Sequence, residues 1–144
     1  MKSNKKICVV GGGDWGKNHI STLNKLGFLG GIVDSSESLI NSYQSSYPNC
    51  RHYSNVEDSF DFSFDGYIIA TPPVSHYEIA KKIIGKGKPV LVEKPFTLDL
   101  KQAIDLNEYA KFKKVNVYVG HLLLFHPAYL KIKELIDDGL IGNI

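Results

Sequence analysis

The sequence has few of the features that mark several classes of protein. It has two cysteines, Cys8 in an apolar run and Cys50 in a polar segment, and neither has a second cysteine nearby. This usage favours two free thiols in a reducing compartment over disulfides or a metal site. The first apolar run, residues 7–10, is far too short for a signal-peptide core or a membrane span. We therefore expect a cytoplasmic protein with no bound metal and no membrane partner.

Arginine is almost absent, because Arg51 is the only one in the chain. The formal net charge is +2, and the lysines are spread along the sequence in short clusters. A nucleic-acid-binding face needs concentrated positive charge with arginine or aromatic readers. We therefore expect no nucleic-acid partner.

The alternation of segments predicts the fold. A chain of 144 residues that is 43% hydrophobic and 22% charged is typical of one globular domain with a core. Short β-branched or apolar runs alternate with longer segments of helical period, a pattern typical of βαβ units. We predict an α/β fold, a doubly wound parallel sheet of about six strands with helices on both faces. The predicted strands are residues 7–10, 29–33, 51–53, 67–70, 90–93 and 115–120.

Local signals mark several helix ends. Asp99 and Ser54 are predicted N-caps. A last helix is predicted from Pro127 to just before Gly139, which would end it. Residues 142–144 then resemble the start of another strand, so we expect the chain to be a fragment of a longer protein.

A glycine-rich turn follows the first predicted strand. Gly11, Gly13 and Gly16 form the pattern G-x-G-x-x-G, with Asp14 and Trp15 between the last two, where a strand turns into a helix. The first glycine permits the tight turn, the second lets a diphosphate approach the backbone, and the third lets the helix pack closely on the sheet. The free N–H groups of that helix would then face the diphosphate. The turn therefore predicts a dinucleotide-binding site.

Three other interpretations of this turn stay open at this point. Residues 11–17 match the first seven positions of a P-loop, but Asn18 stands where a Ser or Thr hydroxyl would reach Mg²⁺. A methyltransferase loop usually has an acid in the preceding strand, and residues 8–10 supply none. The third is a glycine-rich turn without a ligand.

Asp34 is the second part of a dinucleotide-binding pattern. It ends the second predicted strand, 18 residues beyond Gly16, close to the spacing of the acid that binds the adenosine ribose hydroxyls. Its carboxylate would repel a 2′-phosphate, and Ser35 and the residues after it bring no arginine to bind one. NAD is therefore favoured over NADP, with a solvated loop acid as the alternative.

Two more segments are predicted to reach the same crevice. The fourth strand runs into residues 70–76, Ala-Thr-Pro-Pro-Val-Ser-His, and the fifth into residues 92–96, Val-Glu-Lys-Pro-Phe. In a doubly wound sheet, ligands bind at the carboxyl ends of the strands around the switch point between the first and fourth. These segments, with residues 11–19, 93–97 (Glu-Lys-Pro-Phe-Thr) and 120–127 (Gly-His-Leu-Leu-Leu-Phe-His-Pro), resemble the Gfo/Idh/MocA family of NAD(P)-dependent oxidoreductases. Members of that family act largely on sugars, cyclitols and nucleotide sugars.

The resemblance implies roles for individual residues. Thr71, Pro72 and His76 would line the cofactor near its ribose and nicotinamide. Glu93 and Lys94 would lie at the reacting end, with Lys94 as the catalytic residue that contacts the nicotinamide side and the substrate hydroxyl. Such a lysine needs a lowered pKa, which burial beside a cationic nicotinamide would supply.

The residues around Lys94 set a geometric condition. Neighbouring strand side chains point to opposite faces, so Glu93 and Lys94 can share a pocket only if the turn reorients one of them. Pro95 holds Lys94 extended, and a cis bond between them would aim the lysine.

Two histidines have different predicted roles. His121 is predicted to line the cleft. His19 is predicted to be a packing residue on the apolar face of the first helix, which it shares with Trp15, Leu23 and Leu26.

The resemblance also implies what the whole protein does. Residues 1–144 would be the dinucleotide-binding domain, and the substrate domain of the family would be absent from this chain. The full-length protein would be a dehydrogenase, expected as a homo-oligomer, that transfers hydride between NAD and a hydroxyl carbon of a sugar or nucleotide sugar. The present chain alone would be inactive. Leu124 stands where the family often has an arginine, which leaves a substrate contact there open. The alternative is a non-catalytic NAD-binding module that acts as a sensor or partner subunit.

Overall fold

A computed structural model describes residues 5–142 of the chain. Its strands are β1 (Ile7–Val10), β2 (Leu29–Val33), β3 (Arg51–Tyr53), β4 (Gly66–Ile69), β5 (Val90–Val92) and β6 (Val117–Val119). Its α-helices are α1 (Gly16–Leu26), α2 (Glu37–Ser46), α3 (His76–Gly85), α4 (Leu100–Lys113) and α5 (Pro127–Asp137). Short 3₁₀ helices are η1 (Asp58–Asp61), η2 (Pro73–Ser75) and η3 (Leu122–Phe125).

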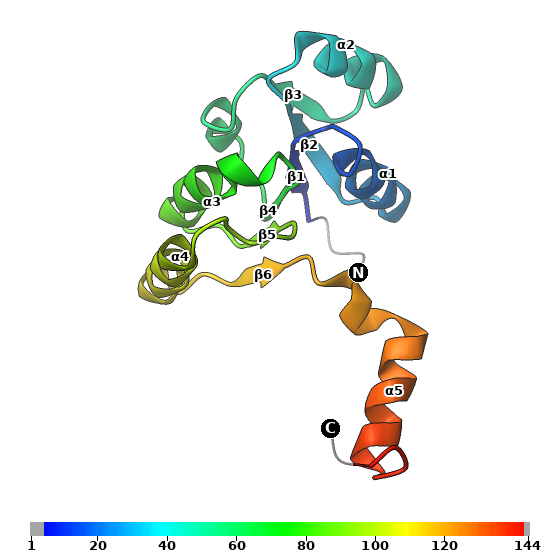
Figure 1. Cartoon of the computed structure of the whole chain (residues 1–144). Coiled ribbons are helices and arrows are strands. Elements are labelled where there is room, and N and C mark those ends of the chain that lie inside the picture. The colour runs from blue at the N-terminus through cyan, green and yellow to red at the C-terminus, as the bar shows by residue number, and fades with distance from the viewer. Residues whose placement is uncertain (1–4, 143–144) are drawn as a thin grey trace.

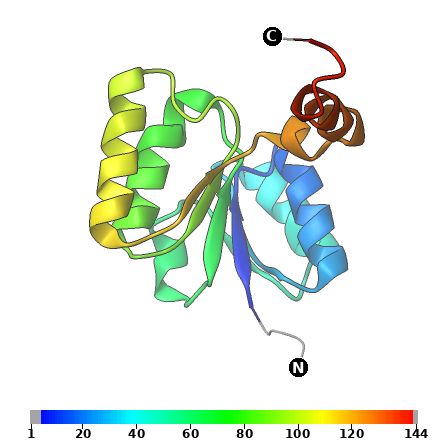
Figure 2. The ribbon, with the colours of Figure 1, turned by 90° about the horizontal axis from the view of Figure 1, so that it is seen from below.

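The six strands form one parallel sheet in the order β3-β2-β1-β4-β5-β6. This order defines the doubly wound Rossmann arrangement and confirms the predicted fold class. Helices α1 and α2 cover one face of the sheet, and α3 and α4 cover the other (Figures 1 and 2). The chain therefore leaves β1 and β4 toward opposite faces, which opens a crevice at their carboxyl ends.

Alternating side chains divide the core into two layers. Cys8 and Val10 of β1 belong to the cluster that packs under α3 and α4, with Leu106 among its buried members. Val9, between them in sequence, belongs to the cluster on the opposite face with Ile20 of α1. Both faces of β1 are therefore buried, as expected for a central strand of a parallel sheet.

Most predicted elements are confirmed, with differences at their ends. The first three strands have the predicted ranges, and the other three differ by one or two residues at an end. Asp99 caps α4, because its Oδ1 accepts the Lys101 N–H at 2.6 Å. The predicted cap at Ser54 is wrong, since the side chain of Asn55 accepts the Asp58 N–H before η1.

The predicted face of the first helix is confirmed at Leu23, which packs against the core cluster that contains Ile20, and is wrong at Trp15 and Leu26. Gly16 and Ile20 are the buried residues of α1, whereas Trp15 is 47% exposed and Leu26 is 60% exposed. The stripe that packs on the sheet therefore runs through Gly16 and Ile20, because the close approach of α1 at Gly16 turns that line of the helix inward.

The C-terminal part stands apart from the sheet. Helix α5 starts at Pro127 and ends before Gly139, as predicted, and it projects away from the body of the domain in Figure 1. The expected start of another strand, at residues 142–144, lies almost wholly outside the described residues. Between residues 5 and 142, no helix has the length and apolar composition of a membrane span. The same residues hold no cluster of potential metal ligands.

Candidate functional site

At two positions of the turn after β1, Gly11 and Gly16, a Cβ would clash with backbone, and at Gly12 it would clash with the ring of Tyr43. Gly11 has φ +94°, and a Cβ on it would lie 2.7 Å from the backbone carbon of Ala70, just beyond β4. A Cβ on Gly16 would clash with the carbonyl oxygen of Gly11. A larger residue at either position would push β1, β4 and α1 apart. The two glycines therefore fix the loop at the switch point of the sheet.

The middle of this loop is open on its outer side. A Cβ on Gly13 would meet no protein atom within 4 Å. In the described structure no side chain caps the N-terminus of α1, and the N–H groups of Lys17 and Asn18 already donate to the carbonyls of Gly13 and Trp15. The N–H groups of residues 13–16 have no partner among the described residues and remain available to an anion. Asp14 lies outside the crevice, where its exposed carboxylate forms an ion pair with Lys17 at 3.0 Å.

Asp34 is built into the architecture of the glycine loop. Its Oδ2 accepts the Gly12 N–H at 2.7 Å, and its Oδ1 accepts the Ser36 N–H at 2.8 Å. Each carboxylate oxygen has a further lone pair, which a ribose hydroxyl could use. The position at the end of β2 and the two backbone contacts distinguish Asp34 from a solvated loop acid.

Tyr43 of α2 fixes the other side of the same peptide. Its hydroxyl donates to the Gly12 carbonyl at 2.5 Å. Burial, Tyr47 and the Asp34 carboxylate raise the pKa of Tyr43, so its hydroxyl keeps its proton and remains a donor. The N–H of Gly12 is held by Asp34 and its C=O by Tyr43, and the loop conformation is therefore set before any ligand binds.

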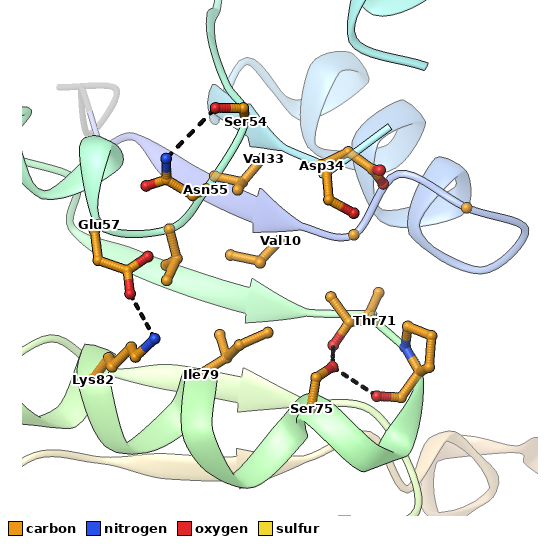
Figure 3. Close-up of a pocket in the computed structure, with 16 residues that line it drawn as sticks. Val10, Val33, Asp34, Ser54, Asn55, Glu57, Thr71, Ser75, Ile79 and Lys82 are labelled. Carbon is orange, nitrogen blue, oxygen red and sulfur yellow. Dashed lines mark hydrogen bonds and ion pairs between the residues drawn. The ribbon is translucent and has the colours of Figure 1, made fainter. Parts of the chain in front are cut away.

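A pocket of about 500 Å³ extends from the glycine loop along the carboxyl ends of β1, β2 and β4 (Figure 3). Its loop end is bordered by Gly11 and Gly13, and its far end by Glu57 and Lys82, which form an ion pair. The hydrogen bond from Lys82 lowers the pKa of the Glu57 carboxyl. The other lining residues are Val10, Val33, Asp34, Ser35, Ser54, Asn55, Val56, Ala70, Thr71, Pro72, Ser75 and Ile79.

A smaller pocket of about 210 Å³ adjoins the first through Ala70 and Thr71, which line both. Its remaining lining residues are Trp15, Pro73, Glu93 and Lys94. The bond between Lys94 and Pro95 is cis, as proposed from the sequence. Glu93 and Lys94 both border this pocket although they are neighbours in the chain. The two pockets together form one elongated site.

The Glu93 carboxylate is buried, and each of its oxygens has one partner. Its Oε1 accepts the Nε2–H of His19 at 2.7 Å, and the Lys94 N–H lies 3.3 Å from its Oε2. A Cβ on Gly120 would lie 2.9 Å from Oε2, so the chain after β6 closes over the carboxylate. The interpretation of His19 as a packing residue is wrong, because its ring bridges α1 to the end of β5.

The interpretation of His76 as a cleft-lining residue is also wrong. Its side chain is 1% exposed and borders neither pocket. Nδ1 lies 2.9 Å from the Pro95 carbonyl oxygen, and Nε2 lies 2.8 Å from that of Thr71. Carbonyl oxygens only accept, so the ring donates through a protonated nitrogen and packs against the other carbonyl with its second nitrogen. His76 joins the segments after β4 and β5 from beneath the site.

These features match a known family. A family model described as an oxidoreductase family with an NAD-binding Rossmann fold, Gfo/Idh/MocA, matches residues 5–121. The chain belongs to this family. Residues 5–121 correspond to the NAD-binding Rossmann fold of this family.

Relatives and solved structures agree with this assignment. Inositol 2-dehydrogenase of Mycolicibacterium smegmatis is 31% identical over 146 residues, which cover 98% of this chain and 42% of the relative. Oxidoreductase P35 of Formosa agariphila is 47% identical over 76 residues, 53% of this chain and 24% of the relative.

Two solved structures share the fold. The WlbA dehydrogenase of Bordetella pertussis, in complex with NADH and UDP-GlcNAcA, has a TM-score of 0.92 at 22% identity and covers 99% of this chain and 44% of that one. GenD2 from gentamicin A biosynthesis, in complex with NAD, has a TM-score of 0.89 at 26% identity and covers 96% of this chain and 41% of that one. This Gfo/Idh/MocA domain thus spans less than half the length of the proteins that it matches.

Other residues singled out from the sequence fall into two groups. Ser35, Thr71 and Pro72 line the larger pocket, where the sequence placed them. His121 is exposed, borders neither pocket, and its role toward a cofactor stays a prediction. Sequence reasoning missed Tyr43, for which no local signal exists. It misjudged His19, although the position one helical turn after Gly16 places that ring beside the same crevice.

Proposed function

We propose that this Gfo/Idh/MocA domain binds NAD along the two adjoining pockets. The diphosphate would lie on the open side of Gly13, against the uncapped N-terminus of α1. The adenosine ribose would donate its hydroxyls to Asp34, and the nicotinamide would reach the smaller pocket beside Lys94. The observation that carries the proposal is the Asp34 carboxylate, fixed on the glycine loop at the edge of an elongated site.

The same geometry supports NAD over NADP. A phosphate on the ribose 2′-oxygen would meet the fixed negative charge of Asp34, and Ser35 beside it offers no positive charge. The nearest cation that lines the larger pocket is Lys82, and Glu57 already pairs with it. Electrostatic repulsion at Asp34 therefore disfavours the phosphorylated cofactor.

In the full-length protein, the reaction would be the oxidation of a sugar or nucleotide-sugar hydroxyl. NAD supplies the hydride acceptor when it is bound. Lys94 is exposed at the edge of the smaller pocket, and no side chain among the described residues hydrogen-bonds its ammonium. During the oxidation, Nζ in its neutral amine form would take up the proton of the substrate hydroxyl, and the ammonium would return that proton in the reverse reaction. Full-length relatives named as inositol dehydrogenases support this substrate class.

In the full-length protein, which we expect to be a homo-oligomer, a second domain would complete the site. The support for the second domain is that segment η3 and helix α5 expose large apolar side chains, because an unpartnered apolar surface of this kind marks an interaction site. These side chains are Leu122, Leu123, Leu124, Phe125, Tyr129, Leu130, Ile132 and Ile136. In a longer form of the protein we expect slower amide exchange in α5 than in residues 1–144. Equal exchange in both forms would contradict the second-domain proposal.

The single tryptophan provides a direct test of the binding mode. Trp15 borders the smaller pocket, where the nicotinamide is proposed to lie. Titration with NADH should quench Trp15 emission and produce energy transfer to the reduced nicotinamide. ADP-ribose should compete with NADH but give no transfer, because it lacks the acceptor ring. NADPH should bind more weakly than NADH in the same assay.

The control is Trp15→Phe, which removes the optical signal. Calorimetric titration of this variant should still show NADH binding, because the diphosphate and ribose contacts are intact. If calorimetry detects no binding of NADH to the wild-type chain, the proposed cofactor site is wrong. If NADH binds without energy transfer, the nicotinamide does not lie at the smaller pocket.

A further inference from the structure

We infer that His19 and His76 are positioning residues that hold Lys94 in place through its two neighbours in the chain. Glu93, on one side of the lysine, is bound by His19 from α1. Pro95, on the other side, is bound by His76 from α3. The inference rests on the proposed role of Lys94 in proton transfer. Neither histidine would touch the cofactor; each would act through a neighbour of Lys94.

The contact with Glu93 fixes both its side chain and the start of the turn. The carboxylate is 5% exposed, so it needs strong partners to remain buried. His19 supplies one at 2.7 Å, and the N–H of Lys94 lies 3.3 Å from the other oxygen. Gly120 leaves room for the carboxylate where a Cβ would not. The engaged carboxylate is thus a structural anchor for the peptide that leads into Lys94.

The contact with Pro95 fixes the end of the turn. Proline has no N–H, so the Pro95 carbonyl is the one backbone hydrogen-bonding group by which this residue can be held. The buried ring of His76 reaches that carbonyl at 2.9 Å and the Thr71 carbonyl at 2.8 Å. Because Thr71 lines both pockets, the ring also ties the position of the lysine turn to the wall of the proposed cofactor site.

Lys94 depends on its neighbours for its position, because its own ammonium has no hydrogen-bond partner among the described residues. A lysine side chain that must be ordered loses up to about 2 kcal/mol of rotamer entropy. With the backbone on both sides fixed, only the side-chain torsions remain to be ordered when a substrate binds. His19 comes from the helix whose N-terminus is proposed to face the diphosphate, and His76 opens the helix after residues 71–75. The two histidines thus connect Lys94 to both cofactor-binding segments.

The position of Lys94 can be measured in the present chain by carbon-13 dimethylation of its lysines, which keeps their charge. Lys94→Arg assigns the Lys94 signal. In the wild-type protein, NADH should shift this signal more than that of Lys131 on α5. In His19→Leu the NADH-induced shift should be largely lost, while the NADH dissociation constant changes by no more than about threefold.

Three further variants separate positioning from a general structural role. His19→Gln keeps an N–H donor toward Glu93 and should restore most of the shift. His76→Asn places an amide N–H near the position of Nδ1, where it can donate to the Pro95 carbonyl and should keep most of the shift, whereas His76→Leu should lose the shift as His19→Leu does. His52→Leu, on the edge strand β3 at the opposite end of the sheet, should leave the Lys94 shift unchanged. If His76→Leu does not fold, the His19 pair alone decides the question.

Two results would overturn the inference for different reasons. Equal NADH-induced shifts in the wild type, His19→Leu and every folded His76 variant would show that Lys94 keeps its place without the histidines, and the proposed function would be unaffected. NADH binding that leaves the wild-type Lys94 signal unshifted would instead remove Lys94 from the proposed site. The role assigned to the two histidines would then fail with it.

Discussion

Two parts of the elongated site, the Asp34 end beside the glycine loop and the Lys94 end at the smaller pocket, differ in how their charged group is held. At the Asp34 end, both carboxylate oxygens accept backbone N–H groups, from Gly12 and Ser36. At the other end, the backbone beside Lys94 is anchored while its ammonium remains exposed and without a partner among the described residues. The two ends therefore suit different tasks. The Asp34 carboxylate is already oriented to bind a ligand, and the Lys94 side chain is free to take part in proton transfer.

The separation has a basis in how the chain folds. Gly12, Ser36 and Tyr43 all lie in the first half of the fold, so the Asp34 end is completed by nearby sequence. The contact between His19 and Glu93 spans 74 positions and joins the two halves. The apolar surface of η3 and α5 follows β6, which pairs with β5, the strand that leads into Lys94. We therefore expect changes at the two ends to affect different measured quantities.

The largest effect should come from Lys94→Ala in the full-length enzyme that we propose. Loss of a positioned acid-base group should lower kcat by about 100-fold or more. The dissociation constant of NAD should change much less, because the diphosphate and ribose contacts lie at the other end. Steady-state kinetics and calorimetric titration measure the two quantities. An unchanged kcat with a loss of cofactor affinity would make Lys94 a binding residue.

The next largest effect should come from Asp34→Ala. The variant loses charged hydrogen bonds to the ribose and leaves the Gly12 N–H without its acceptor. We expect NAD binding to weaken by about 1.5–3 kcal/mol, which is about 10- to 150-fold in the dissociation constant. The difference between the dissociation constants of NAD and NADP should become smaller, because the repulsion of the 2′-phosphate is removed. Calorimetric titration with both cofactors measures this. Unchanged constants for both would show that Asp34 serves only the protein's own loop.

The smallest effect should come from Tyr43→Phe. The variant loses the hydrogen bond to the Gly12 carbonyl but keeps the ring against the loop, so binding should weaken by about 1 kcal/mol, or about fivefold. Tyr47→Phe is the matched control, since its ring packs beside Tyr43 and its hydroxyl has no partner among the described residues. Equal NADH affinities of the two variants would mean that the loop does not depend on Tyr43.

The sequence by itself determined the sheet, the glycine loop and the place of Asp34. Strand period, helix period and the steric demands of Gly11 and Gly16 act over a few residues, so a short stretch of sequence specifies each of them. The Glu-Lys-Pro segment could be assigned to the crevice because the carboxyl ends of parallel strands meet there. The cap at Ser54 failed for a local reason, since the neighbouring Asn55 offers the same kind of acceptor one position later.

Only the tertiary structure decided what the histidines and Tyr43 do. A histidine in sequence has no preferred partner, and its role depends on which acceptor the fold brings within about 3 Å. For His19 that acceptor is a carboxylate 74 positions away, and for His76 it is a pair of carbonyls from two different loops. Tyr43 reaches Gly12 because α2 packs beside the loop. Periodicity predicts the face on which a side chain lies, but the packing of whole elements selects the atom that it binds.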